Sequence, residues 1–126
     1  MKQDELNEII YLHERWLEGC GDGKRADLRG ADLRNLCLSH ADLRGVNLRW
    51  CIGNGREIKT IQSDGAPIVY TKYEMAISDE QHAIADWWNF TDEQIKAMDE
   101  DDGDGALAFW RKWKPILQAI MGIGHG

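Results

Sequence analysis

Leucine recurs at every fifth position in the middle of the chain, a period that fits neither a helix nor a strand. From Ala26 to Trp50 the sequence reads as five unbroken quintets with leucine third in each. A helix would spread these leucines around its circumference, and a strand would place them on alternate faces. We therefore expect a chain that turns a corner after each quintet and directs the first and third residues to a common axis. These core positions are Ala26, Leu28, Ala31, Leu33, Leu36, Leu38, Ala41, Leu43, Val46 and Leu48.

The segment before the quintets has the apolar spacing of an amphipathic helix. Within residues 4–18 the apolar positions recur three or four residues apart, and Gly19 is a typical C-terminal stop. We expect this helix to lay its apolar side over the first coil as a cap. Its positions on that side are Leu6, Ile9, Ile10, His13, Trp16 and Leu17.

The leucine period ends after Trp50, because Gly53 occupies the next third position. Residues 56–77 have the composition of extended segments interrupted by a turn. We expect irregular coils or short strands here that continue the stack of quintets.

The remainder of the chain predicts helices. Two capping-box spacings, Ser78 with Gln81 and Thr91 with Gln94, open helices expected over 79–89 and 92–99.

A last helix is expected from about residue 105, with Asp104 as its cap and Pro115 kinking or splitting it. Packing between helices is the expected role of the tryptophans in this tail, although an exposed tryptophan can also be a binding hot spot. They are Trp87, Trp88, Trp110 and Trp113.

The quintets ADLRG, ADLRN, LCLSH, ADLRG and VNLRW resemble the pentapeptide-repeat family, whose motif is A(D/N)LXX. The resemblance implies a right-handed quadrilateral β-helix with one repeat per face, in which Leu28 stacks under Leu48. The expected fold class is α+β: a capping helix in 1–20, a short β-helix with its irregular continuation in 21–78, and an acidic, tryptophan-rich helical segment in 79–126. The stretches ADWWNF and ALAFWRKWK also resemble short pentapeptide-repeat proteins of phages and prophages.

Charge is distributed unevenly over the 126 residues. The net charge is −7, with an excess of two bases in residues 20–50 and of six acids in residues 79–126. This balance argues against a general nucleic-acid binder. Without an apolar run long enough to cross a membrane or a secretory leader, and with three widely spaced cysteines, we expect a protein of a reducing cytoplasm. The phage resemblance implies that this is the cytoplasm of a bacterial host.

The polar residues offer few candidates for chemistry. Asp and Arg at the second and fourth quintet positions should point outward and form rows of exposed ion pairs between stacked coils, each contributing at most about 1 kcal/mol. Residues 100–105 partly imitate a calcium loop, but Arg111 stands where a bidentate glutamate is required, so we favour a solvated loop. Cys37 and His40 have the spacing of zinc ligands without a convergent set. We expect no cofactor, no metal and no enzymatic activity.

Several pentapeptide-repeat proteins imitate DNA and occupy the DNA-binding groove of gyrase. The quintets here carry net positive charge, so only the acidic terminal segments could imitate the phosphates of DNA. We expect a phage-type inhibitor, similar to anti-CRISPR proteins, that blocks the nucleic-acid groove of a host complex without binding nucleic acid or membrane itself. Modulation of gyrase and a scaffolding role, with a possible homodimer, are the alternatives. The candidate partner-binding residues are Asp99, Glu100, Asp101, Asp102 and Asp104.

Overall fold

The computed structural model describes residues 1–121, which fall into two compact units. The first unit is Met1–Ile84 and contains one helix, the quintets and four strands. The second begins at Ala85 and is helical. Together they give the mixed α+β composition expected from the sequence.

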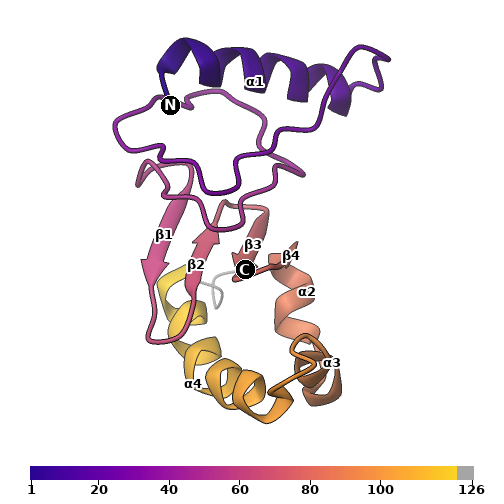
Figure 1. Cartoon of the computed structure of the whole chain (residues 1–126), viewed down its shortest axis with the longest axis vertical. Coiled ribbons are helices and arrows are strands. Elements are labelled where there is room, and N and C mark those ends of the chain that lie inside the picture. Colours follow the sequence, from indigo (N-terminus) through magenta and orange to yellow (C-terminus); the bar gives the residue numbers. More distant parts are fainter. Residues whose placement is uncertain (122–126) are drawn as a thin grey trace. The chain divides into compact units, whose positions relative to one another are not determined.

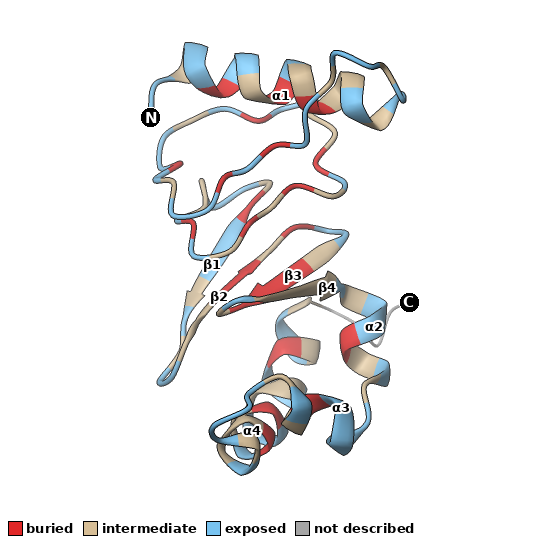
Figure 2. Cartoon of the chain, turned by 45° about the vertical axis from the view of Figure 1, so that its right-hand side comes forward, coloured by how far each residue is buried: buried red, intermediate tan, exposed pale blue. Residues whose placement is uncertain are grey.

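Helix α1 (Gln3–Leu17) lies along one end of the coil formed by the quintets (Figure 1). Leu6 and Ile10 are buried in the same apolar cluster as the quintet leucines. The buried side of the helix faces the coil, and its exposed side faces away (Figure 2). Gly19 follows with a φ of 80°, a conformation that glycine adopts readily at the end of a helix.

Each quintet ends in a tight turn, and this explains the residue types at the fifth position. The first amide of the following quintet donates to the leucine carbonyl, as in the bond from Ala31 to Leu28 at 3.0 Å. This pattern, with a positive φ at the third residue of the turn, is that of a type II β-turn. Glycine and asparagine tolerate that φ best. The corner residues with positive φ are Gly30, Asn35, His40, Gly45, Trp50 and Gly55.

Four quintets make one coil of the chain. Parallel bridges join Asp27 to Asn47 and Asp32 to Ile52, residues that lie twenty positions apart. The third-position leucines fill the interior, and Leu33 and Leu43 are only 0% and 4% exposed. Ala26, Leu28, Leu38, Val46 and Leu48 are buried with them, while Ala31, Leu36 and Ala41 are partly buried against the cluster.

Polar side chains of α1 bond to the open backbone edge of the first coil. Gln3 accepts the N–H of Cys37 at 2.7 Å and donates to the carbonyl of the same residue at 2.9 Å. Glu14 accepts the N–H of Asp42 at 3.1 Å. These side chains satisfy backbone groups that the next coil of a longer stack would bond.

His13 of α1 is fully buried and bonds to the coil through both ring nitrogens. Its Nδ1 accepts the N–H of Ala26 at 3.0 Å, and its Nε2 lies 2.7 Å from the carbonyl oxygen of Arg44. Because a backbone N–H can only donate and a carbonyl can only accept, the ring is neutral and carries its proton on Nε2. His13 is therefore a structural residue that joins the helix to two sides of the coil.

The opposite edge of the coil is covered from the strands. Gln81 accepts the N–H of Leu48 at 2.8 Å and donates to the carbonyl of Val46. Glu74 accepts the N–H of Gly45 at 3.2 Å. Side chains thus bond to backbone groups at both ends of the coil.

Residues 59–83 form an antiparallel sheet in the order β1-β2-β3-β4, rather than the expected continuation of the stack. The extended character was predicted correctly, but each strand pairs with its neighbour through a short hairpin connection, which fixes the antiparallel direction. Val69 and Ala76 belong to the coil's apolar cluster. The strands are β1 (Lys59–Gln62), β2 (Pro67–Tyr70), β3 (Glu74–Ile77) and β4 (Glu80–Ala83).

The helix expected over 79–89 begins only at Ile84, because Glu80–Ala83 pair with β3. Ser78 does not cap a helix. It has a φ of 53° in the connection between β3 and β4, and Gln81, its expected capping-box partner, bonds to the coil instead.

The second unit comprises α2 (Ile84–Asn89), of which Ile84 still belongs to the first unit, α3 (Asp92–Ala97) and α4 (Gly103–Met121). The predicted capping box of Thr91 and Gln94 is present in both directions. Tryptophan rings pack at the centre, where Trp110 lies 5.2 Å from Trp87 and 6.0 Å from Trp88 between ring centroids.

Two details of α4 differ from expectation. Its cap is Asp102, which accepts the N–H of Gly105 at 3.0 Å, because the helix begins at Gly103 and Asp104 already lies inside it. The helix also continues through Pro115 without being split. Trp110 and Leu117 are buried on either side of the proline, and their packing offsets the lost backbone bond. Within residues 1–121, no helix is both long and apolar enough to cross a membrane.

Candidate protein-binding surfaces

The acidic loop, residues 99–104, connects α3 to α4 and has a shape fixed by two of its own carboxylates. Asp99 accepts the N–H groups of Asp101 and Asp102, both at 3.0 Å. Asp102 caps α4. All five acidic side chains of the loop are exposed. Glu100, Asp101 and Asp104 are thus presented on a backbone that the other two hold in place.

The same geometry does not assemble the calcium site that the loop partly imitates. Asp99 and Asp102 direct oxygens to backbone N–H groups, and Asp104 lies 3.6 Å from Lys96. Across the described residues, no three His, Cys, Asp or Glu side chains gather closely enough to hold a metal ion. Cys37 and His40 accordingly remain apart from any ligand set, and burial raises the pKa of the Cys51 thiol to about 11.

In the three quintets that contain both, the outward Asp and Arg pair with each other, and not between coils as expected. Arg29 donates from Nε and Nη2 to the two carboxylate oxygens of Asp27, at 2.9 and 2.8 Å. Residues two apart on an extended face point the same way, so each pair closes locally. The same bidentate arrangement joins Asp32 to Arg34 and Asp42 to Arg44.

These pairs predict a low titration midpoint for Asp32. Hydrogen bonds from the Arg34 side chain, and then from its backbone N–H, lower the pKa of Asp32 from 3.8 to about 2. The pair therefore contributes its stability above pH 3.8 and loses it as the pH falls through about 2. A carboxyl-carbon NMR titration of the folded protein should show this midpoint near 2. In Arg34→Gln it should rise toward 3.8, and an unchanged midpoint would contradict the assignment.

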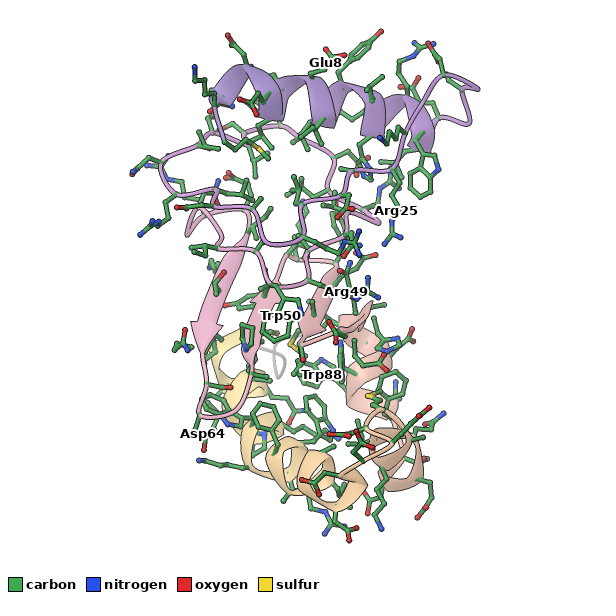
Figure 3. All side chains as sticks on the ribbon, in the orientation of Figure 1. Glu8, Arg25, Arg49, Trp50, Asp64 and Trp88 are labelled. Carbon is green, nitrogen blue, oxygen red and sulfur yellow. The ribbon has the colours of Figure 1, made fainter. Side chains whose placement is uncertain are left out.

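One side of the coil differs from the others in the residues it exposes. Residues 25–30 and 45–50, which we name the arginine–tryptophan face, stack in parallel through the bridge from Asp27 to Asn47. This register places Arg29 beside Arg49 and Gly30 beside Trp50. Arg25 and Arg49 lie on the same side of the coil (Figure 3).

Trp50 is the unusual residue of this face. Its side chain is 48% exposed, and its indole N–H donates to Asp79 Oδ1 at 2.8 Å. Its φ of 64° lies in the left-handed region, which costs a residue with a Cβ roughly 1–2 kcal/mol. With Asp27, Arg29 and Gly30 it lines an open depression of about 500 Å³.

A second exposed indole stands at the other corner of the face. Trp16 of α1 is 41% exposed, stacks on His13, and lies against Gly45, where a Cβ would come within 3.3 Å of the ring. Sequence analysis placed Trp16 on the apolar side of the capping helix, where it was not expected to be exposed, and did not single out Trp50. For Trp50 the signal was present, because a tryptophan occupies a corner where neighbouring quintets have glycine, asparagine or histidine.

Comparison with known proteins agrees with the quintet pattern. Residues 24–49 match the family model described as pentapeptide repeats (8 copies), and this stretch holds the five quintets up to Arg49. The match covers about a fifth of the chain and supports a pentapeptide-repeat protein. No curated protein and no solved structure matches the chain.

Proposed function

We propose that this chain is a non-enzymatic binding protein that inhibits a nucleic-acid-binding complex of a bacterial host. The observation that carries the proposal is the acidic loop. Its three outward carboxylates are those of Glu100, Asp101 and Asp104, of which Asp104 lies 3.6 Å from Lys96, and Asp99 and Asp102 fix the backbone beneath them. A group of negative charges on a fixed backbone can occupy positions that a basic groove provides for phosphates.

Charge also supports an inhibitor that does not bind nucleic acid itself. The described part of the second unit, residues 85–121, carries eight acidic and four basic residues. Such a surface repels nucleic acid and is attracted to proteins that bind it. Association should then be fast and sensitive to salt.

The finer identity that we propose is a phage-type inhibitor of a host defence complex, similar to anti-CRISPR proteins and acting in the bacterial cytoplasm. The likeness of its tryptophan-rich tail to phage proteins supports this origin. We also propose that the quintets form a right-handed quadrilateral β-helix. The turn after each quintet and the bridges between residues twenty apart favour that geometry.

Charge reversal of the loop tests the proposal. Reversing Glu100, Asp101 and Asp104 to Lys should abolish capture of nucleic-acid-binding proteins from a bacterial lysate, because it removes the mimicry without touching the carboxylates that hold the loop. Capture by the parent protein, analysed by mass spectrometry, should be strong at about 50 mM salt and weak at about 200 mM.

The matched control reverses three exposed acids of the first unit, Glu5, Glu8 and Glu18, and changes the net charge by the same amount. It should capture the same proteins as the parent. If the control loses capture as fully as the loop variant, net charge and not the loop is responsible. If the parent retains nothing at low salt, the proposal fails.

The two alternatives rest on the coil. A gyrase modulator would need an acidic coil surface, but here Asp27, Asp32 and Asp42 each pair with an arginine of the same quintet. A scaffold assembled through coil ends would need open backbone edges, but Gln3 and Gln81 bond to those edges. A supercoiling assay with gyrase and a solution mass measurement test these alternatives directly.

A further inference from the structure

We infer that the arginine–tryptophan face is a second docking surface, and that it takes an acidic segment of a protein partner. It lies on the first unit, whereas the acidic loop lies on the second. The inference therefore stands apart from the proposed function and can be tested separately.

The backbone of Trp50 gives the first argument. Quintet corners favour glycine or asparagine, and a bulky residue in the left-handed region is a true outlier. Trp50 nevertheless holds this conformation at a φ of 64° while nearly half of its side chain faces solvent. Packing in the core does not explain the residue, and strained positions of this kind gather at binding sites.

The arginines of the face give the second argument. Arg25 is held by a bond from its Nε to the carbonyl of Gly45, and Arg49 by a bond from its Nε to the carbonyl of Asp79. Arg29 is held by Asp27 through Nε and Nη2. Each guanidinium is thus fixed in place while at least one terminal Nη is left for an additional acceptor. Guanidinium groups that are already held in position bind carboxylates with little further loss of side-chain entropy.

Local charge decides the sign of the partner. Three arginines, at 25, 29 and 49, and the carboxylates of Asp27 and Asp79 lie at this face. The carboxylate of Glu74 also reaches it and accepts the N–H of Gly45. All three carboxylates are already bonded: Asp27 to Arg29, Asp79 to the Trp50 indole, and Glu74 to Gly45 and Gln81. A cationic partner would find every carboxylate occupied, whereas an acidic side chain would meet guanidinium groups that can still donate.

The wider charge distribution favours a protein over a nucleic acid. Residues 1–84 carry fourteen acidic and eleven basic residues, so the surroundings of the face repel a long polyanion. A short acidic segment meets only the face itself. An apolar side chain of the same segment can enter the depression beside Trp50, in the manner of an interface anchor.

The experiment uses a fluorescein-labelled peptide of about ten residues, built of glutamate and leucine, with the full chain and anisotropy detection. We expect saturable binding that weakens roughly tenfold or more in Arg29→Gln and in Trp50→Gly. Arg34→Gln is the matched control, because Arg34 makes the same bidentate pair with Asp32 on another side of the coil. It should bind the peptide like the parent.

Trp50→Gly also separates binding from folding. Glycine adopts the corner conformation without strain. The reference variant is Asp79→Asn, which weakens the indole hydrogen bond but keeps the strained tryptophan. The melting temperature of Trp50→Gly should therefore be no lower than that of Asp79→Asn. The inference is overturned if the parent shows no saturable binding, or if Arg34→Gln weakens it as much as Arg29→Gln does. It is also overturned if a labelled single strand of about ten thymidines binds more tightly than the peptide.

The loop variant with Glu100, Asp101 and Asp104 reversed should bind this peptide at least as well as the parent. If the loop variant no longer captures proteins from the lysate but still binds the peptide, both the proposed function of the loop and the docking surface are supported. A protein that captures host proteins but never binds the peptide overturns the docking surface and leaves the proposed function standing.

Discussion

Replacing His13 with alanine should lower the free energy of unfolding of the first unit by about 4 kcal/mol. The imidazole is completely buried and is hydrogen-bonded to two backbone groups, the N–H of Ala26 and the carbonyl of Arg44. Alanine leaves these two backbone groups without a partner and leaves a void between α1 and the coil. The loss of a satisfied buried group is more costly than the loss of an exposed one, since no water replaces the bond.

Urea unfolding followed by circular dichroism measures the effect. Glu8→Ala is the control, because Glu8 lies on the outer side of the same helix (Figure 3) and should change stability by no more than about 0.5 kcal/mol. His13→Leu fills much of the volume without restoring either bond, so it should remain about 2 kcal/mol below the parent. A leucine variant as stable as the parent would mean that the two hydrogen bonds contribute nothing.

The interior of the coil could be predicted from the sequence because a single physical requirement repeats. A leucine that must reach the same axis after every turn leaves a period of five that no helix or strand produces. The helix over the coil was predicted for a similar reason, since its apolar side is periodic. Such patterns are visible without knowing what the side chains touch.

The direction of the chain after the quintets could not be predicted in this way. Residues 59–83 have the composition of extended segments, which holds equally for a parallel coil and an antiparallel sheet. The choice depends on short connections, such as the one around Ser78 with its positive φ, and on distant partners. Gln81 has a capping-box spacing, but its amide is bonded by the backbone of Val46 and Leu48, more than thirty residues earlier.

The two candidate surfaces could likewise be predicted from the sequence only in part. Five acidic residues in a row of six are obvious in the sequence, yet which of them hold the loop depends on where α4 begins. Asp102 became the cap because the helix starts at Gly103, two residues before the predicted start. Trp50 was visible as an odd corner residue, but its neighbours Arg29 and Gly30 come from the preceding coil, twenty positions away.

Gly53→Ala should destabilise the first unit by more than about 3 kcal/mol, although the change restores a Cβ at a position where the quintets have leucine. A Cβ on Gly53 would lie 2.1 Å from the carbonyl oxygen of Ile58 and 2.6 Å from its carbonyl carbon. These are backbone atoms, so they cannot move aside as the end of a flexible side chain can. Ile58 is completely buried in the leucine cluster, and its side chain fills the interior that a leucine at 53 would otherwise occupy.

The segment around Ile58 is also held by its own bonds, which is why the clash cannot relax easily. Gly55 donates to the Ile58 carbonyl at 3.0 Å, and the Asn54 side chain accepts the Ile58 N–H at 3.2 Å. Gly21→Ala is the matched control, because a Cβ there meets nothing within 4 Å, and it should be neutral or stabilise by up to about 1 kcal/mol. Urea unfolding of Gly53→Ala and Gly53→Leu should show both well below this control. If Gly53→Leu were as stable as the parent, the quintet stack would extend through residue 53, and Ile58 would not be what ends it.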